Sequence, residues 1–596
     1  MRNGARNHSQ TNGHTRTLVF LSVVASYAHT NLAAWILRAG VEHVDLPRVS
    51  RGLPRAPLRW RWHEVEVSRN DSLPVVLMRL TRFQPAVLAA TFYLFNRSFL
   101  LALISRFKVL APQCRVVAGG PEFLGDNRAF MLQFPFIDAV IRGEGEMAFA
   151  AWLAGIRRPA AWVTIPGFCG VVNGRYVDNG MAEMMTRLDD IPSPYPAHLK
   201  TFHKPFILLE TSRGCANQCA FCTSAGIPVR YFSPDRVRRD LRLITAGGVP
   251  EVRLVDRTFN DRPIRYLPLL RMFRDDFKSL RFHLEIDPAR ITPAMLNELA
   301  AAEPHRFHIE AGVQTLNPKV LRSLRRQGTV GRVRKGIVQL CRLRNLDVHL
   351  DLIAGLPGAT LADVLHDLQT LIPLNPSEIQ LEILKLLPGT RLDLAARECS
   401  PLRQSASPRR VAKASLERSR WRIVAAPEPP YEVLQTSTMS AEDMDAARKL
   451  SNLVDWFYNV PELRPVILLA VRLWPHFWEG LIQSGERYLD ISHAPSLENR
   501  FRWLDAVFRG KKDIGLIHTL HYAWLKHGFS AQHGICPTHA WKEPLPTDAV
   551  LVEGDAVESG ARRFMAQLEY PTLFIYGHDR CAAAIYRLPS HVVTTI

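Results

Sequence analysis

Long apolar runs alternate with helix-like stretches along the first 160 residues. The runs LVFLSVVAS (18–26), AVLAATFYLF (86–95), CRVVAGG (114–120) and FIDAVI (136–141) are almost continuously apolar. Runs of this kind are typical of parallel strands buried on both faces, with helices as the crossovers between them. The pattern therefore predicts an α/β domain with a Rossmann-like sheet over residues 17–160. Ligands of such sheets bind beyond the carboxyl ends of the strands, here the loops SYAHTN, TFYLFN, GGPEF and RGEGE.

A second alternating series begins at Phe206. Six apolar runs, which start FILLE, EVRLV, RFHLEI, RFHIEA, DVHLDL and EIQLEI, are separated by helical stretches. This arrangement predicts a partial or full parallel (β/α) barrel over residues 205–395, whose chemistry would lie at the carboxyl ends of its strands. Residues 161–204 carry a turn signal at Asn173-Gly174 and then a proline-rich stretch, and they predict a hairpin followed by a linker.

The remaining segments have other patterns. Residues 1–16 are polar and basic, which predicts a disordered N-terminus. Residues 396–420 predict an exposed basic connector, and residues 421–596, rich in Trp and His, predict a mainly helical C-terminal domain. The apolar run after residue 16 is too short to cross a membrane and leads at once into a helix start, so we expect a strand and not an export signal. No membrane association is expected.

Charge and cysteine usage narrow the possible partners. The 596 residues carry a formal net charge of +19. That charge could attract anions or nucleic acid, but no basic block alternates with aromatic residues, so nucleic-acid binding is not expected. Six of the nine cysteines are scattered singly, which is not a disulfide framework and favours a reducing, cytoplasmic location.

The other three cysteines are clustered. Cys215, Cys219 and Cys222 lie in TSRGCANQCAFCTS, just after the first predicted barrel strand. Three thiolates on one loop can converge on one metal centre, but a structural zinc usually has four protein ligands. Iron–sulfur clusters use cysteine thiolates, and a missing fourth ligand would leave one iron open to a substrate or cofactor. The sequence therefore predicts an iron–sulfur centre in preference to a small zinc loop.

The spacing CxxxCxxC, with an aromatic residue before the last Cys, resembles the radical S-adenosylmethionine (SAM) superfamily. The resemblance implies that Cys215, Cys219 and Cys222 bind a [4Fe–4S] cluster whose fourth iron is held by SAM. It also implies SAM contacts at the strand ends in LVDRTFN, HLEID, IEAGVQT and LIAGLPG. The residues so implied are Asp256, Glu285, Glu310, Gln314 and Gly355.

The N-terminal domain resembles the cobalamin-binding domains that precede some radical SAM barrels, through VVAGGPEF and AVIRGEGE. Thr91, Gly119, Gly120 and His29 are the cobalamin-site residues that this resemblance implies. His29 lacks the flanking Asp and Gly of the D-x-H-x-x-G motif that ligates cobalt in cobalamin methyltransferases. PPYEVLQTSTMS, beyond the barrel, resembles a radical SAM subgroup with a C-terminal domain of unknown function.

The resemblance implies a radical SAM enzyme that cleaves SAM and functionalises, for example C-methylates, an unknown small molecule or peptide. A flavodoxin or ferredoxin would supply the electron. Three alternatives stay open: a cobalamin-free radical SAM enzyme with a vestigial N-terminal domain, a tRNA methylthiotransferase, and a non-enzymatic cluster or cobalamin sensor. A methylthiotransferase needs a second cysteine triad before the barrel, where this chain has only Cys114 and Cys169.

Overall fold

The computed structural model describes residues 15–43, 60–199, 202–397, 421–488, 494–529, 534–536, 538–540, 549–554, 562–568, 571–576 and 582–587. Most of the predicted N-terminal tail and of the 396–420 connector lies outside these residues. The chain forms two compact units: residues 1–312, 317–346 and 384–437 make the first, and residues 313–316, 347–383 and 438–596 make the second.

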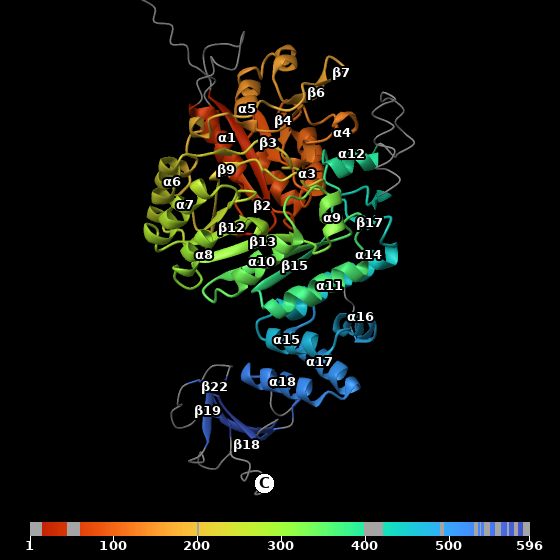
Figure 1. The fold of residues 1–596 in the computed structure, drawn as a ribbon. Coiled ribbons are helices and arrows are strands. Elements are labelled where there is room, and N and C mark those ends of the chain that lie inside the picture. The colour runs from red at the N-terminus through yellow and green to blue at the C-terminus, as the bar shows by residue number, and fades with distance from the viewer. Residues whose placement is uncertain are drawn as a thin grey trace, which may run out of the picture. The chain divides into compact units, whose positions relative to one another are not determined.

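The N-terminal sheet of the first unit is the predicted Rossmann-like sheet (Figure 1). Its strands are β1 (Arg16–Val24), β2 (Trp60–Ser68), β3 (Val87–Thr91), β4 (Arg115–Gly119), β5 (Ala139–Ile141), β6 (Phe168–Val172) and β7 (Arg175–Asp178). Their order is β2-β1-β3-β4-β5-β6-β7, parallel as far as β5 and antiparallel from β5 to β7. The β6–β7 hairpin turns at Asn173-Gly174, both at positive φ, as predicted.

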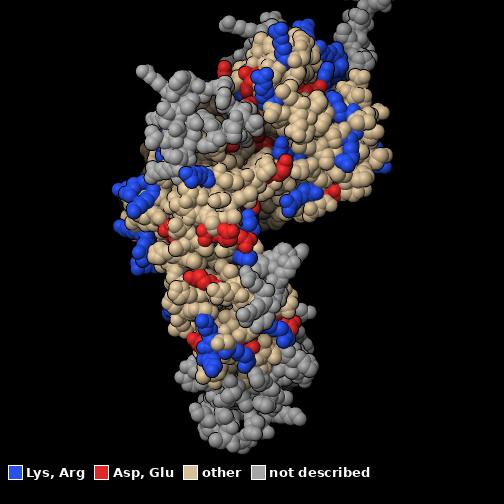
Figure 2. Space-filling view, turned by 90° about the vertical axis from the view of Figure 1, so that its right-hand side faces the viewer, with Lys and Arg blue, Asp and Glu red and all other residues tan. Residues whose placement is uncertain are grey.

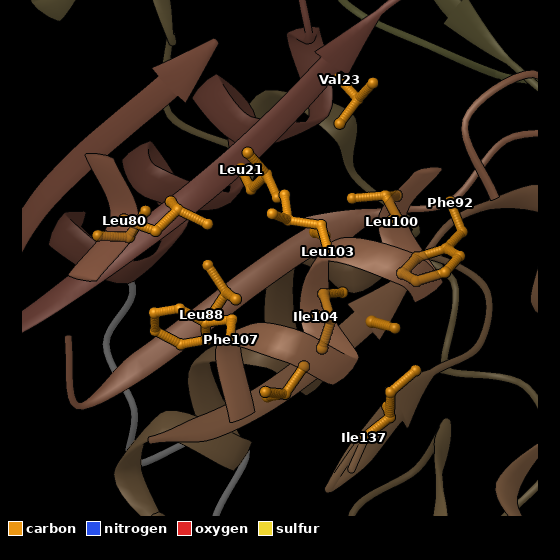
Figure 3. Packing of buried hydrophobic residues seen from close by; sticks show 14 of the residues in the cluster. Leu21, Val23, Leu80, Leu88, Phe92, Leu100, Leu103, Ile104, Phe107 and Ile137 are labelled. Atoms are coloured by element: carbon orange, nitrogen blue, oxygen red, sulfur yellow. The ribbon is translucent and has the colours of Figure 1, made fainter. Parts of the chain in front are cut away.

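Helices pack on both faces of this sheet. They are α1 (Leu32–His43), α2 (Leu73–Thr81), α3 (Arg97–Leu110), α4 (Arg128–Gln133) and α5 (Gly145–Ala154). On one face, Leu21 and Leu88 pack with Leu103 and Phe107 of α3 in a fully buried apolar cluster (Figure 3). Such burial contributes roughly 1.5–3 kcal/mol per large side chain, so this core holds the loops at the strand ends in place.

The rest of the first unit holds most of the predicted barrel. Strands β8 (Ile207–Leu209), β11 (Glu251–Leu254), β12 (Arg281–Ile286) and β13 (Phe307–Gln314) pair in parallel in this order. The helices are α6 (Pro234–Ala246), α7 (Pro263–Asp275), α8 (Pro293–Ala300), α9 (Pro318–Ser323), α10 (Val330–Cys341) and α12 (Arg391–Arg397). Two short antiparallel pairs complete it: β9 (Ser212–Arg213) with β10 (Arg230–Tyr231), and β16 (Val424–Ala425) with β17 (Val433–Gln435).

The second unit contains the other two predicted barrel strands, β14 (Asp347–Ala354) and β15 (Glu378–Ile383), paired in parallel, and helix α11 (Leu361–Leu371). Its C-terminal helices are α14 (Ala441–Leu453), α15 (Arg464–Leu473), α16 (Phe477–Tyr488), α17 (Leu497–Lys511) and α18 (Ile514–Lys526). An antiparallel sheet follows, with strands β18 (Thr538–Ala540), β19 (Val550–Gly554), β20 (Arg562–Gln567), β21 (Pro571–Tyr576) and β22 (Ala582–Arg587). The helices confirm the prediction, whereas this sheet was not predicted.

Candidate functional site

The three clustered cysteines lie on the loop that β9 and β10 bracket. Cys215 and Cys219 are buried and Cys222 is partly exposed. The loop closes on itself, because the Cys215 amide donates to the Ile227 carbonyl at 3.0 Å and the Gly226 amide donates to the Asn217 carbonyl at 3.0 Å. Gly214 has φ +95°, and a Cβ there would lie 2.4 Å from the Pro228 carbonyl oxygen. Only glycine fits where the two ends of the loop meet.

Asp256, directly after β11, holds the beginning of this loop. Its fully buried carboxylate accepts from the amides of Thr211 (2.7 Å) and Ser212 (3.0 Å) and from both of their hydroxyls. The Arg265 guanidinium donates to the same carboxylate at 2.7 Å. These bonds engage both carboxylate oxygens, so the structure gives Asp256 a positioning role on the loop.

Further contacts hold the middle of the loop. Asn217 donates to the buried Asp287 carboxylate at 3.2 Å, and Gln327 donates to the Ala216 carbonyl at 3.1 Å. The Arg326 guanidinium lies 3.7 Å from the Cys219 sulfur. Burial raises the pKa of the Cys219 thiol, Arg326 lowers it, and the neighbouring thiols of Cys222 and Cys215 raise it. Three cysteines on one short loop, one of them beside a guanidinium, are a donor set that fits a cluster of thiolate-bound irons.

The predicted SAM residues lie in both units. Glu285 on β12 pairs in register with Glu310 on β13, both side chains are half-buried, and His283 Nε2 lies 2.8 Å from a Glu310 carboxylate oxygen. Gln314 ends β13 at φ +68°, and Gly355 follows β14 at φ +85°. Gln314 and Gly355 belong to the second unit. Their roles, and those of Glu285 and Glu310, stay predictions.

A cavity of about 970 Å³ lies between the N-terminal sheet and the cysteine loop, within the first unit. One wall is formed by the carboxyl ends of β3 and β4 with the loops that follow them. The opposite wall is formed by the first barrel strands and by Thr223, Ser224 and Ile227 of the cysteine loop. The cavity is therefore where the ligand-binding edges of the two sheets meet, at the upper end of the size range of small-ligand pockets.

Small residues shape the N-terminal wall. Ala89, Ala90, Thr91 and Gly119 all line the cavity, and so does Gly120. Gly120 has φ +108°, and a Cβ there would lie 2.6 Å from the Phe92 carbonyl oxygen. This close approach of the two loops requires glycine, and the small side chains along this wall leave room for a ligand beside the strand ends.

A buried ion network borders the cavity. Arg213 pairs with Glu146 at 2.7 Å, with Glu210 at 2.8 Å and with Glu144 at 3.4 Å, and Arg230 pairs with Glu144 at 2.5 Å. Burial opposes ionisation of Glu144, but Arg230 and Arg213 overcome it and lower its pKa. The network ties the RGEGE loop of the N-terminal domain to the barrel. Sequence reasoning did not single out Arg213, although it lies in the segment that follows the first barrel strand β8.

His29 is not among the residues that line the cavity, although the next residue, Thr30, is. Its Nδ1 is 2.8 Å from the Ser26 hydroxyl, and its ring packs edge-on against Phe206. Burial lowers the pKa of His29, and the nearby Arg253 and Lys204 lower it further. The structure thus places His29 against the segment that leads into the barrel.

Two family models match the chain. Residues 209–371 match the radical SAM superfamily, and residues 419–476 match DUF4080, a protein family of unknown function. These matches confirm the predicted resemblance to a radical SAM barrel with a C-terminal domain of unknown function.

Similar curated proteins include three methyltransferases. An uncharacterized methyltransferase from Pyrococcus horikoshii is 24% identical over 46% of this chain and 62% of its own length. The cobalamin-dependent radical SAM methyltransferase TokK from Streptomyces tokunonensis is 28% identical over 30% of this chain and 28% of its own length. The 2-(S-pantetheinyl)-carbapenam-3-carboxylate methyltransferase of Streptantibioticus cattleyicolor is 29% identical over 32% of this chain and 30% of its length. The chain thus spans less than two thirds of each of these relatives.

Solved structures agree with the fold. The cobalamin-dependent SAM radical enzyme OxsB with aqua-cobalamin bound superposes with a TM-score of 0.59 over 87% of this chain and 83% of that chain, at 12% identity. The radical SAM methyltransferase TsrM from Kitasatospora setae, with tryptophan and a SAM analogue bound, gives 0.55 over 79% of this chain and 99% of that chain, at 16% identity. At these identities the likeness confirms the predicted fold class and nothing finer.

Proposed function

Because residues 209–371 match the radical SAM superfamily, we propose that the protein is a cobalamin-dependent radical SAM enzyme that functionalises, and most simply C-methylates, an unactivated carbon of its substrate. The observation that carries the proposal is the cavity, which has the cysteine loop on one wall and the small-residue strand ends of the N-terminal sheet on the other. A reaction that uses two cofactors needs both beside one substrate.

Cys215, Cys219 and Cys222 would hold the [4Fe–4S] cluster, with SAM on the iron that they leave open. When bound, the cluster and SAM supply the one-electron chemistry that breaks an unactivated C–H bond, and cobalamin supplies a methyl group for transfer. The protein positions these groups and excludes water. Asp256, Asn217 and Arg326 fix the loop before any cofactor arrives.

The remaining predicted residues have subsidiary parts in this proposal. Glu285 and Glu310 would contact SAM from neighbouring strands of the first unit. Gln314 and Gly355 are proposed as further SAM contacts on the strength of the sequence resemblance alone. Thr91, Gly119 and Gly120 would form the wall beside the corrin ring. A flavodoxin or ferredoxin would deliver the electron, the substrate would be a small molecule or peptide, and the cytoplasm would keep the thiolates reduced.

A tRNA methylthiotransferase is disfavoured by the cysteines before the barrel. A tRNA-2-methylthio-N(6)-dimethylallyladenosine synthase from Mycobacterium avium is 24% identical over 42% of this chain and 35% of its own length, so this function has to be considered. Cys114 and Cys169 are nevertheless buried at 2% and 0% exposure beside the N-terminal sheet. Burial raises the pKa of Cys114 to about 12 and that of Cys169 to about 11. A methylthiotransferase needs a second triad of cysteines before the barrel, and this chain has only these two there.

Anaerobic reconstitution followed by reduction with dithionite tests the proposal. The protein should bind about four irons and four sulfides, as one [4Fe–4S] centre requires. With SAM it should release 5′-deoxyadenosine, even in slow turnover without substrate. Replacing Cys215, Cys219 and Cys222 together by Ala should abolish both, whereas Cys341→Ala, on α10, serves as the matched control. Zinc without iron contradicts the radical function, and a full cluster with intact SAM favours the sensor. If the protein releases 5′-deoxyadenosine but does not retain hydroxocobalamin, the result supports a cobalamin-free radical SAM enzyme instead.

A further inference from the structure

Arg257 is the residue after Asp256, at the carboxyl end of β11. Whereas Asp256 is fully buried, the Arg257 side chain is exposed and lines the cavity. The same cavity surface includes Thr223 and Ser224 of the cysteine loop and Tyr93 of the loop after β3. Burial raises the pKa of Tyr93, and Arg257 lowers it, which is consistent with a guanidinium near the phenol. Arg257 thus lies where the two ligand-binding edges face each other.

The charge of Arg257 is not neutralised by the part of the chain that the structure describes. The other inner charges of the cavity are matched, since Glu144, Glu146 and Glu210 all pair with Arg213. Among the described residues no carboxylate lies within ion-pair distance of Arg257, and Glu183, an exposed lining residue, is not paired with it either. A positive charge therefore projects into a cavity whose walls are mostly small and apolar.

We propose that Arg257 binds an anionic group of the substrate, a carboxylate or a phosphate. This inference rests on the proposed function and names the substrate class. Guanidinium presents a planar fork of donors that matches either anion with two parallel hydrogen bonds. In a mostly apolar cavity, one such group fixes the orientation of a ligand, and this decides which carbon lies near the reacting atoms. Asp256 is engaged by the loop, so it does not compete for the guanidinium.

Three probes of one shape test the inference: 2-naphthoate, 2-naphthyl phosphate and the neutral 2-naphthamide. Their dissociation constants are measured by anaerobic calorimetry on protein loaded with cluster, hydroxocobalamin and SAM. Wild type should bind at least one anion about tenfold or more tightly than the amide, as charge-assisted hydrogen bonds do. In Arg257→Gln the ratio of the amide's dissociation constant to the anion's should fall to about twofold or less. Arg257→Lys should keep part of the preference for the anion. Arg242→Gln, an equal charge change on the exposed face of α6, should keep all of it.

Several outcomes would overturn the inference. Absence of an anion preference in wild type, including absence of binding by any probe, or a preference that survives in Arg257→Gln, contradicts it. The same titrations are repeated on protein without cofactors. An anion preference seen only there would mean that Arg257 holds an anionic group of SAM or of the cobalamin tail, and this also overturns the substrate assignment. Release of 5′-deoxyadenosine by wild type, measured separately, shows whether the proposed function itself stands.

Discussion

At the scale of the residue, Asp256 shows how one buried carboxylate positions a whole loop. Two amides, two hydroxyls and one guanidinium donate to it. Removing a single partner from a buried charged network leaves the others unpaired, which typically costs about 3–5 kcal/mol. An ionised carboxylate is therefore required at this position, since only a carboxylate accepts from all five donors.

Asp256→Asn should weaken the loop locally. The Asn side chain keeps only one acceptor oxygen, so its NH2 group must face either the amides of Thr211 and Ser212 or the Arg265 guanidinium, and in both arrangements donors of the loop lose an acceptor. We expect hydrogen-exchange protection of the peptide that contains them to fall by about a hundredfold, which corresponds to about 3 kcal/mol. Iron retention after reconstitution should fall with it. Asp275→Asn, which removes an exposed carboxylate bound to Arg274, is the control and should change neither. Unchanged protection in Asp256→Asn would refute the positioning role.

Residue patterns predicted the cysteines and the paired glycines but not the groups that hold them. Cys215, Cys219 and Cys222 carry their chemistry in local spacing, and Gly120 follows from its place after a buried strand. Arg213 and Arg326 became visible only in the structure. Their partners, Glu146 and the Cys219 sulfur, lie 67 and 107 positions away in the chain. The periodic patterns used to predict helices and strands do not indicate contacts between residues so far apart in the sequence.

At the scale of the element, strands buried on both faces were predicted well, whereas the edge strand β2 was not predicted. β1, β3 and β4 are continuous apolar runs, so their pattern is unambiguous. β2, at the edge of the N-terminal sheet, reads WRWHEVEVS and is only partly buried, so charged positions weaken its signal. The sheet β18–β22 follows a long helical region and was not predicted, although β21 and β22 are mostly apolar.

The titratable residue Glu64 on β2 is hydrogen-bonded to neighbouring elements. Glu64 accepts hydrogen bonds from Ser22 on β1 at 3.0 Å and from Trp35 on α1 at 2.9 Å. Burial raises the pKa of Glu64 to about 7, while these two donors lower it. In the unfolded chain the same group titrates near its ordinary 4.5, so between these values the folded state holds more of this proton. Stability from this group is therefore present below about pH 4.5 and is lost as pH rises to about 7.

Glu64→Gln should remove that pH dependence. The melting temperature of the variant relative to wild type should rise between pH 5 and pH 8, because only wild type must ionise a buried carboxyl. The corresponding change in the free energy of unfolding of the variant relative to wild type should be at most about 3 kcal/mol, since each pKa unit is worth about 1.4 kcal/mol. Melting curves of both proteins at several pH values measure it, and other titrating groups cancel in the comparison. Glu42→Gln, in a surface pair with Arg38, should show no trend. If the melting temperatures of Glu64→Gln and wild type differ by the same amount at every pH, Glu64 does not have the raised pKa described above.

At the scale of the whole molecule, the sequence carries a formal net charge of +19, whose distribution can be followed on one face. Figure 2 shows Lys and Arg side chains interspersed with Asp and Glu over the face in view. Interspersed charge is typical of a solvated surface, whereas a nucleic-acid groove needs a continuous basic track. In the described residues, no helix combines the length and apolarity needed to cross a bilayer.

The cavity arises because two separate sheets present the same kind of edge to each other. Each sheet alone places ligands beyond the carboxyl ends of its strands. In the first unit, the Arg213 network and the contact of Gly389 with Leu124 and Gly125 hold these edges together, and a Cβ on Gly389 would lie 2.8 Å from the Leu124 backbone. The sequence predicted each edge, but their meeting depends on these long-range contacts.

The position of His29 predicts how cobalamin would sit in this cavity. His29 follows β1 in the loop expected to supply a cobalt ligand, yet it lies outside the cavity lining and its ring is engaged by Ser26 and Phe206. Because the imidazole would have to leave both contacts to reach the cavity, we expect no protein nitrogen on cobalt. Electron paramagnetic resonance of cob(II)alamin-loaded protein should therefore be the same in wild type and His29→Ala. His203→Ala, at an exposed position in the neighbouring linker, is the control. A nitrogen splitting that is present in wild type and lost only in His29→Ala would show that the loop rearranges to ligate cobalt, and it would overturn this arrangement of the site.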